Sequence, residues 1–183
     1  MTDRLLNPAK ARLLFRYRCV LGFFIVALVL SGVTAFPLLY ELRLLSAFLG
    51  VEPQSPVPSP GLGYWIHEVR WGLEDMHVHH PWIAYGTDWL AFAHLTIAIF
   101  FIGPFREPAR NRWVLEAGVI ACLLVPVLAF ACGPLRGIPF AWRCVDASFG
   151  VGGIVPLLYC LRLTRALESS TQGTRRSSSE VQA

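Results

Sequence analysis

Residues 19–40 read CVLGFFIVALVLSGVTAFPLLY, a run of 22 positions without a charged side chain. A helix needs about 20 mainly apolar residues to cross a hydrocarbon core about 30 Å thick. Three further apolar runs follow at residues 86–104, 113–131 and 139–161, and arginines flank the four runs on alternate sides. The sequence therefore predicts an all-α integral membrane protein, folded as a bundle of four transmembrane helices.

The composition supports this class. Hydrophobic residues make up 55% of the 183 positions and charged residues 15%, and the mean hydropathy is +0.51. These values lie on the membrane side of the range for soluble domains. The net charge of +4 comes mainly from basic residues that flank the apolar runs. Basic residues at these positions are expected on the cytoplasmic side of membrane spans. We expect the lipid bilayer as the surroundings and no nucleic acid as a partner.

Lysine and arginine are unevenly divided between the two sides of the predicted membrane. The N-terminus (1–18), the second connection (105–112) and the tail (162–183) hold 12 of them, and the other side holds four. Because cytoplasmic segments are enriched in these residues, both termini are predicted to be cytoplasmic, in a bacterium at the inner membrane. The first run is too long for a signal-peptide core and lacks a small-x-small cleavage site, so we expect it to be retained.

The connection at 41–85 is predicted to be an outer loop with two parts. Four prolines between residues 51 and 60 exclude a helix there. Residues 64–80 place apolar side chains at helical spacing among charged ones, which predicts an amphipathic helix lying at the membrane interface. A shorter outer loop is expected at 132–138. The tail is rich in Ser, Thr, Gln and Arg, and disorder is predicted from about residue 169.

Ionisable residues inside apolar runs are costly, so they are candidates for function. The candidate intramembrane cluster is Asp88, His94, Arg143 and Asp146. His94 lies in a seam of small residues with Thr87, Ala91 and Ala98 on the second run, and Arg143 and Asp146 lie in a seam with Gly150 and Gly153 on the fourth. Small residues allow close helix packing, so we expect both seams to face other helices. Two interpretations stay open: a structural set in which Arg143 pairs with Asp146, or a quinone or proton-handling site.

Four histidines occur close together in the first outer loop, and they are candidate metal ligands: His67, His77, His79 and His80. Imidazole suits zinc, copper and haem iron, but the spacing matches no established ligand motif. A haem between two spans needs a histidine on each of them, and His94 alone lies within a span. A haem, metal or quinone cofactor therefore stays an alternative, supported by the kinds of side chain present and not by their spacing.

The five cysteines form no C-x-x-C pair, which argues against a thiol oxidoreductase. Cys132 and Cys144 fall at the predicted outer ends of the third and fourth spans. In an oxidising compartment these two thiols are candidates for a disulfide that closes the short loop.

The sequence carries no catalytic signature and no internal repeat. The expected function is that of a non-enzymatic subunit or accessory factor of a larger inner-membrane assembly, with a membrane-protein partner or a second copy of the chain. The first alternative is a redox or cofactor-binding protein that uses His94 and the outer histidines and acids. The second is a small proton-coupled transporter or channel.

Overall fold

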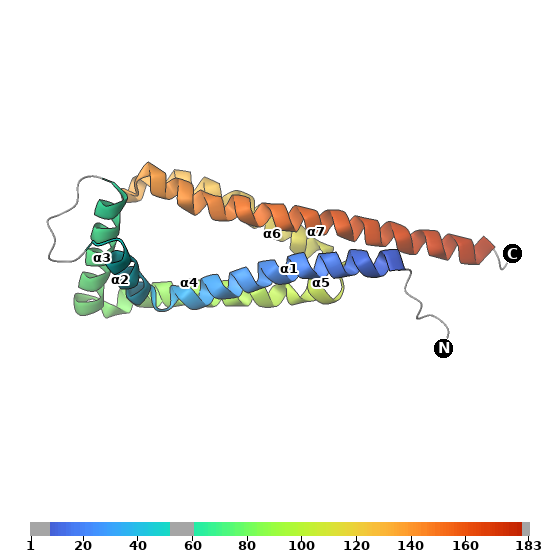
Figure 1. The fold of residues 1–183 in the computed structure, drawn as a ribbon, viewed down its shortest axis with the longest axis horizontal. Coiled ribbons are helices and arrows are strands. Elements are labelled where there is room, and N and C mark those ends of the chain that lie inside the picture. The colour runs from blue at the N-terminus through green and yellow to red at the C-terminus, as the bar shows by residue number, and fades with distance from the viewer. Residues whose placement is uncertain (1–7, 52–60, 181–183) are drawn as a thin grey trace. The chain divides into compact units, whose positions relative to one another are not determined.

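The structure is a computed structural model that describes residues 8–51 and 61–180, with side chains described as far as Ser169. Within these residues the chain is helical and contains no strand, as Figure 1 shows. The all-α prediction is confirmed. The elements are α1 (Pro8–Ala35), α2 (Leu38–Phe48), α3 (Leu62–His79), α4 (Pro81–Phe100), α5 (Ile102–Arg106), α6 (Arg112–Cys132), the 3₁₀ turn η1 (Pro134–Arg136) and α7 (Phe140–Glu180).

Four helical segments of the described chain are long and apolar enough to cross a membrane. They are Pro8–Ala35, Pro81–Arg106, Arg112–Cys132 and Phe140–Ser169. Each contains most of one predicted apolar run, so the predicted number of membrane-length helices is confirmed.

The first apolar run differs from a single span because of Pro37. Proline has no backbone N–H and clashes with the preceding helical turn. α1 accordingly ends at Ala35, and a separate helix, α2, begins at Leu38. The last residues of the predicted span, including Tyr40, therefore belong to α2, which continues to Phe48.

The described chain forms two compact units. One comprises residues 8–26 and 99–180, and the other comprises residues 27–51 and 61–98. In the first unit α6 and α7 lie side by side as a helical hairpin closed by η1 (Figure 1). In the second unit α2 packs against α3.

Glycines bring α6 and α7 into close contact. Pro126 lies within α6, and because it lacks an N–H, the carbonyl of Cys122 one turn earlier loses its helical donor. Gly150 of α7 lies against this carbonyl, and Gly153 lies against the Cys122 thiol. A Cβ atom at Gly153 would lie 2.7 Å from Cys122 Sγ. The predicted small-residue seam on the fourth run therefore faces α6.

The start of α1 is joined to α5 and α7 by buried polar contacts. The Tyr17 hydroxyl donates a hydrogen bond of 2.9 Å to the carbonyl of Pro104, in α5. The Cys160 thiol, on α7, lies 3.9 Å from the Tyr17 carbonyl. Tyr17, Pro104 and Cys160 are all fully buried. These contacts tie three segments of this unit together at one point.

In the second unit the close approach is between α1 and α4. A Cβ atom at Gly32 would lie 2.9 Å from the carbonyl oxygen of Ala91 and 3.1 Å from the Leu95 side chain. Ala91 and Ala98 are buried, so small members of the second predicted seam are packed as expected. Gly50, with a φ of 67°, ends α2 in the left-handed conformation that favours glycine.

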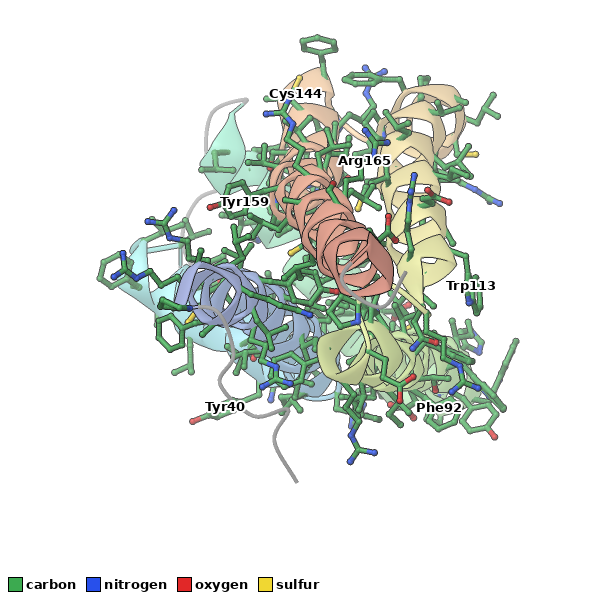
Figure 2. All side chains as sticks on the ribbon, turned by 90° about the vertical axis from the view of Figure 1, so that its right-hand side faces the viewer. Tyr40, Phe92, Trp113, Cys144, Tyr159 and Arg165 are labelled. Carbon is green, nitrogen blue, oxygen red and sulfur yellow. The ribbon has the colours of Figure 1, made fainter. Side chains whose placement is uncertain are left out.

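Most large apolar side chains of the four long helices point outward. Only between 11% and 28% of the positions in their most apolar windows are buried. Figure 2 shows Phe92 of α4 and Trp113 of α6 projecting away from their helices, and they are 56% and 63% exposed. A water-soluble domain would bury such side chains, because burial of apolar area is its main source of stability.

Two other predicted segments compare with the structure as follows. The amphipathic helix predicted at 64–80 corresponds to α3, which begins two residues earlier at Leu62 and ends at His79. The tail predicted to be disordered from about residue 169 continues α7 to Glu180, since no proline follows Pro156 to interrupt it. The proline-rich residues 52–60 lie outside the described residues.

Candidate functional site

Two clefts in the unit of residues 27–98 share Phe36 and Asp88. The first, here the polar cleft, has a volume of about 400 Å³ and lies between α2, α3 and α4. Most of its lining is apolar, and its polar or charged members are Tyr40, Arg43, His77, Thr87 and Asp88. The second, here the aromatic cleft, has a volume of about 300 Å³ and is lined by Phe36, Tyr85, Asp88, Trp89 and Phe92. Apolar clefts with a few convergent polar groups are the usual form of a ligand site.

The aromatic cleft is built by one face of α4. Residues three or four positions apart share a helix face, which places Tyr85, Asp88, Trp89 and Phe92 together. Neighbouring rings pack edge to face, with centroids 5.9 Å apart for Tyr85 and Trp89 and 5.8 Å apart for Trp89 and Phe92. This arrangement is the favoured one for aromatic pairs. The Asp88 carboxyl group is half-buried beside these rings.

An ion pair holds Arg43 at the edge of the polar cleft. Its Nε atom donates to the Glu74 carboxylate at 3.0 Å, and the Nε atom of Arg70 donates to the same oxygen at 3.2 Å. One carboxylate therefore serves two guanidinium groups and leaves one positive charge in excess. The contact also joins α2 to α3 beside the cleft.

These contacts predict a pH-dependent stability. Burial tends to raise the pKa of Glu74, but the hydrogen bonds and charges of Arg43 and Arg70 outweigh it and lower that pKa below 4.5. The contribution is thus present at neutral pH, declines as the pH falls below 4.5 and is lost as the pH passes through the lowered pKa. Because Arg43 is 53% exposed, we expect it to amount to less than about 1 kcal/mol.

Thermal unfolding of the detergent-solubilised protein over this pH range measures the effect. Glu74→Gln should lower the melting temperature at neutral pH and flatten its dependence on acid. Glu68→Gln is the matched control, since this glutamate is also on α3 and its one ion pair among the described residues is with His67, at 3.9 Å. Equal profiles for the two variants would contradict the role given to Glu74.

The structure does not gather the four candidate metal ligands into one group, although the rings of His79 and His80 lie 6.5 Å apart. His77 lines the polar cleft. His79 Nδ1 lies 2.8 Å from the Asp75 carboxylate, and the His80 ring lies 6.3 Å from the Trp82 ring. The Nδ1 atom of His67 is buried without a hydrogen-bond partner among the described residues. Within that part of the chain, no group of three or more His, Cys, Asp and Glu could hold a metal ion.

His94 does not line either cleft. Its Nδ1 lies 2.8 Å from the carbonyl of Leu90, one turn earlier on α4. A carbonyl only accepts hydrogen bonds, so the proton of the neutral ring is on Nδ1 and Nε2 is the free acceptor. Nε2 is thus the atom that a haem or metal would use, and a cofactor at His94 stays a prediction.

Arg143 and Asp146 belong to the other compact unit, where both lie on α7. The pair expected between them is not formed, because no nitrogen of Arg143 lies within 4.0 Å of a described carboxylate. The Arg143 guanidinium instead lies 5.3 Å from the Phe140 ring centroid, and the side chain packs against Gly133. Stacking on an aromatic ring is a common alternative to an ion pair for arginine. A function shared by all four members of the predicted cluster stays a prediction.

All five cysteines are free thiols in the structure, and Cys132 and Cys144 are both exposed. The predicted disulfide between them therefore stays a prediction. Cys122 and Cys160 instead take part in packing between helices, as small apolar residues do.

Sequence reasoning assigned Asp88 and His77 to two separate clusters, whereas both line the polar cleft. Phe36, Tyr40 and Arg43 are not among the predicted site residues, because the predicted first span runs without a break to residue 40. Pro37 was the available signal that the chain changes direction there. Comparison with protein families, with curated proteins and with solved structures finds no match to this chain.

Proposed function

We propose that this chain is an integral membrane protein that acts as a non-enzymatic subunit or accessory factor of a membrane assembly. The observation that carries the proposal is the outward apolar surface of its long helices. Side chains such as Phe23, Leu128 and Phe149 are 72%, 63% and 72% exposed. Water does not favour such surfaces, so lipid or the apolar helices of a partner must cover them.

The distribution of charge supports an orientation with both termini in the cytoplasm. In this orientation the basic residues near Arg16, Arg110 and Arg162 lie on the cytoplasmic side, and the segment that joins the first two apolar runs lies on the periplasmic side of a bacterial inner membrane. α3 then lies in the outer interface, with its Trp71 and with Trp82 at the start of α4 at the level of the lipid headgroups, and with the exposed Asp75 and His79 facing water.

The expected result is co-isolation of a stoichiometric partner. The full chain, tagged and expressed at its natural level, is extracted from membranes with digitonin and purified without heating. We expect it to resist carbonate extraction and to elute in a complex larger than its own 20.4 kDa plus detergent. The complex should contain another membrane protein or further copies of the chain.

Two results would contradict the proposal. A stable particle with a single chain and no co-isolating protein would remove the subunit role. A reducible Soret band or a stoichiometric metal in the same sample would replace it with the cofactor-binding alternative, and His94→Ala would then identify the ligand. Release of the chain by carbonate would contradict its integral membrane position.

A further inference from the structure

The carboxylate of Asp88 is the least compensated charge of the two clefts. It lines both of them and is half-buried. Among the described residues, no nitrogen of Arg, Lys or His lies within 4.0 Å of it, so it takes part in no ion pair there. Burying even part of a charge costs free energy unless an opposite charge or hydrogen-bond donors compensate it. A cationic ligand would supply that compensation.

The side chains around Asp88 restrict which cation fits. In the aromatic cleft its companions are four rings: Phe36, Tyr85, Trp89 and Phe92. The faces of aromatic rings attract cations, with Trp the strongest, and the attraction is greatest where water is excluded. A carboxylate among aromatic rings is the arrangement that recognises an alkylated or primary ammonium group.

The alternatives fit less well. A calcium or magnesium ion takes six or more oxygen ligands, whereas Asp88 is the only carboxylate among the described residues that line either cleft. An anion would meet the negative charge of Asp88 in both clefts. A neutral apolar molecule would leave that charge buried beneath it without a partner.

We propose that the clefts around Asp88 bind an organic ammonium group, held by the Asp88 carboxylate and by the rings of Tyr85 and Trp89. The polar cleft also contains Arg43, whose charge is opposite to that of Asp88. This guanidinium is already paired with Glu74. The ammonium group can come from a lipid headgroup or from a free small cation. The same chemistry serves both sources, and the site goes beyond the proposed subunit role.

The full chain in maltoside micelles tests the proposal by native mass spectrometry and calorimetry. The lipid probes are phosphatidylcholine and phosphatidylglycerol with identical acyl chains, and the soluble probe is choline chloride. We expect phosphatidylcholine to bind at least about tenfold more tightly than phosphatidylglycerol, which carries no cation. Asp88→Asn should abolish this preference. The matched control is Asp75→Asn, because Asp75 is on α3 and lines neither cleft.

A second variant guards against misfolding of Asp88→Asn. Trp89→Leu keeps an apolar side chain and the carboxylate but removes one ring, and we expect it to weaken binding of the ammonium group several-fold. Binding of choline alone with the affinity of the lipid would support the site and assign it to a free cation. Equal binding of the two lipids by the wild type would overturn the proposal. A preference that survives in both Asp88→Asn and Trp89→Leu would overturn it as well.

Discussion

Gly150→Ala is expected to destabilise the protein by about 1–3 kcal/mol, the usual cost of adding a methyl group to a full interior. The new Cβ would overlap the carbonyl oxygen of Cys122 and lie 2.9 Å from Pro126 Cδ and 3.0 Å from Val125 Cβ. The nearest of these atoms belongs to the backbone, so no side-chain rotation can relieve the overlap. α7 would have to move away from α6, and the contacts along the hairpin would weaken together.

Gly152→Ala is the matched control, because it adds the same methyl group two residues away where nothing lies within 4 Å. Any gain in helix propensity from glycine to alanine, about 0.5–1 kcal/mol, is common to both variants. We expect the control to be as stable as the wild type or more so. Thermal unfolding in detergent, followed by circular dichroism, measures the difference. If the two variants had equal melting temperatures, the packing of α6 against α7 described above would be wrong.

The helices were predictable because long apolar runs leave the chain few choices. Because a bilayer offers no water to bond the backbone, an uninterrupted apolar run of this length is expected to be a helix, and its extent is read directly from residues such as 113–131. The seams were predictable for a similar reason. Gly150 and Gly153 are one helical turn apart on the fourth run, and the structure packs both against α6. Ala91, on the second run, is buried.

The clefts were not predictable, because they depend on tertiary contacts. Asp88, Arg43 and His77 line one cleft because Pro37 ends α1 and α2 packs against α3, a contact that includes the pair of Arg43 with Glu74. No periodicity in the sequence encodes a contact between residues 43 and 74. The expected pair of Arg143 with Asp146 failed for a related reason, since helical spacing permits that contact but the nearby ring of Phe140 competes for the guanidinium.

Tyr17→Phe should destabilise the protein by about 1–2 kcal/mol, although it removes a single oxygen atom. The carbonyl of Pro104 would normally accept a helical hydrogen bond from residue 108, but that residue is a proline without an N–H. The Tyr17 hydroxyl donates to this carbonyl instead, at 2.9 Å, and both residues are fully buried. The variant leaves a buried carbonyl unsatisfied, which costs more than the net value of an ordinary hydrogen bond.

Tyr159→Phe provides the comparison, because this tyrosine is in the same unit but is 39% exposed, and its hydroxyl makes no hydrogen bond to the described residues. We expect no more than about 0.5 kcal/mol for that variant. Unfolding of both proteins in the same detergent, with the wild type alongside, gives the two differences. Because α1 carries Tyr17 and α5 carries Pro104, the loss should also expose the start of α1 to proteolysis first. A Tyr17→Phe protein as stable as the Tyr159→Phe protein would show that the Pro104 carbonyl finds another donor, and the tie between α1 and α5 would then have to come from apolar packing such as that of Phe24 against Phe101.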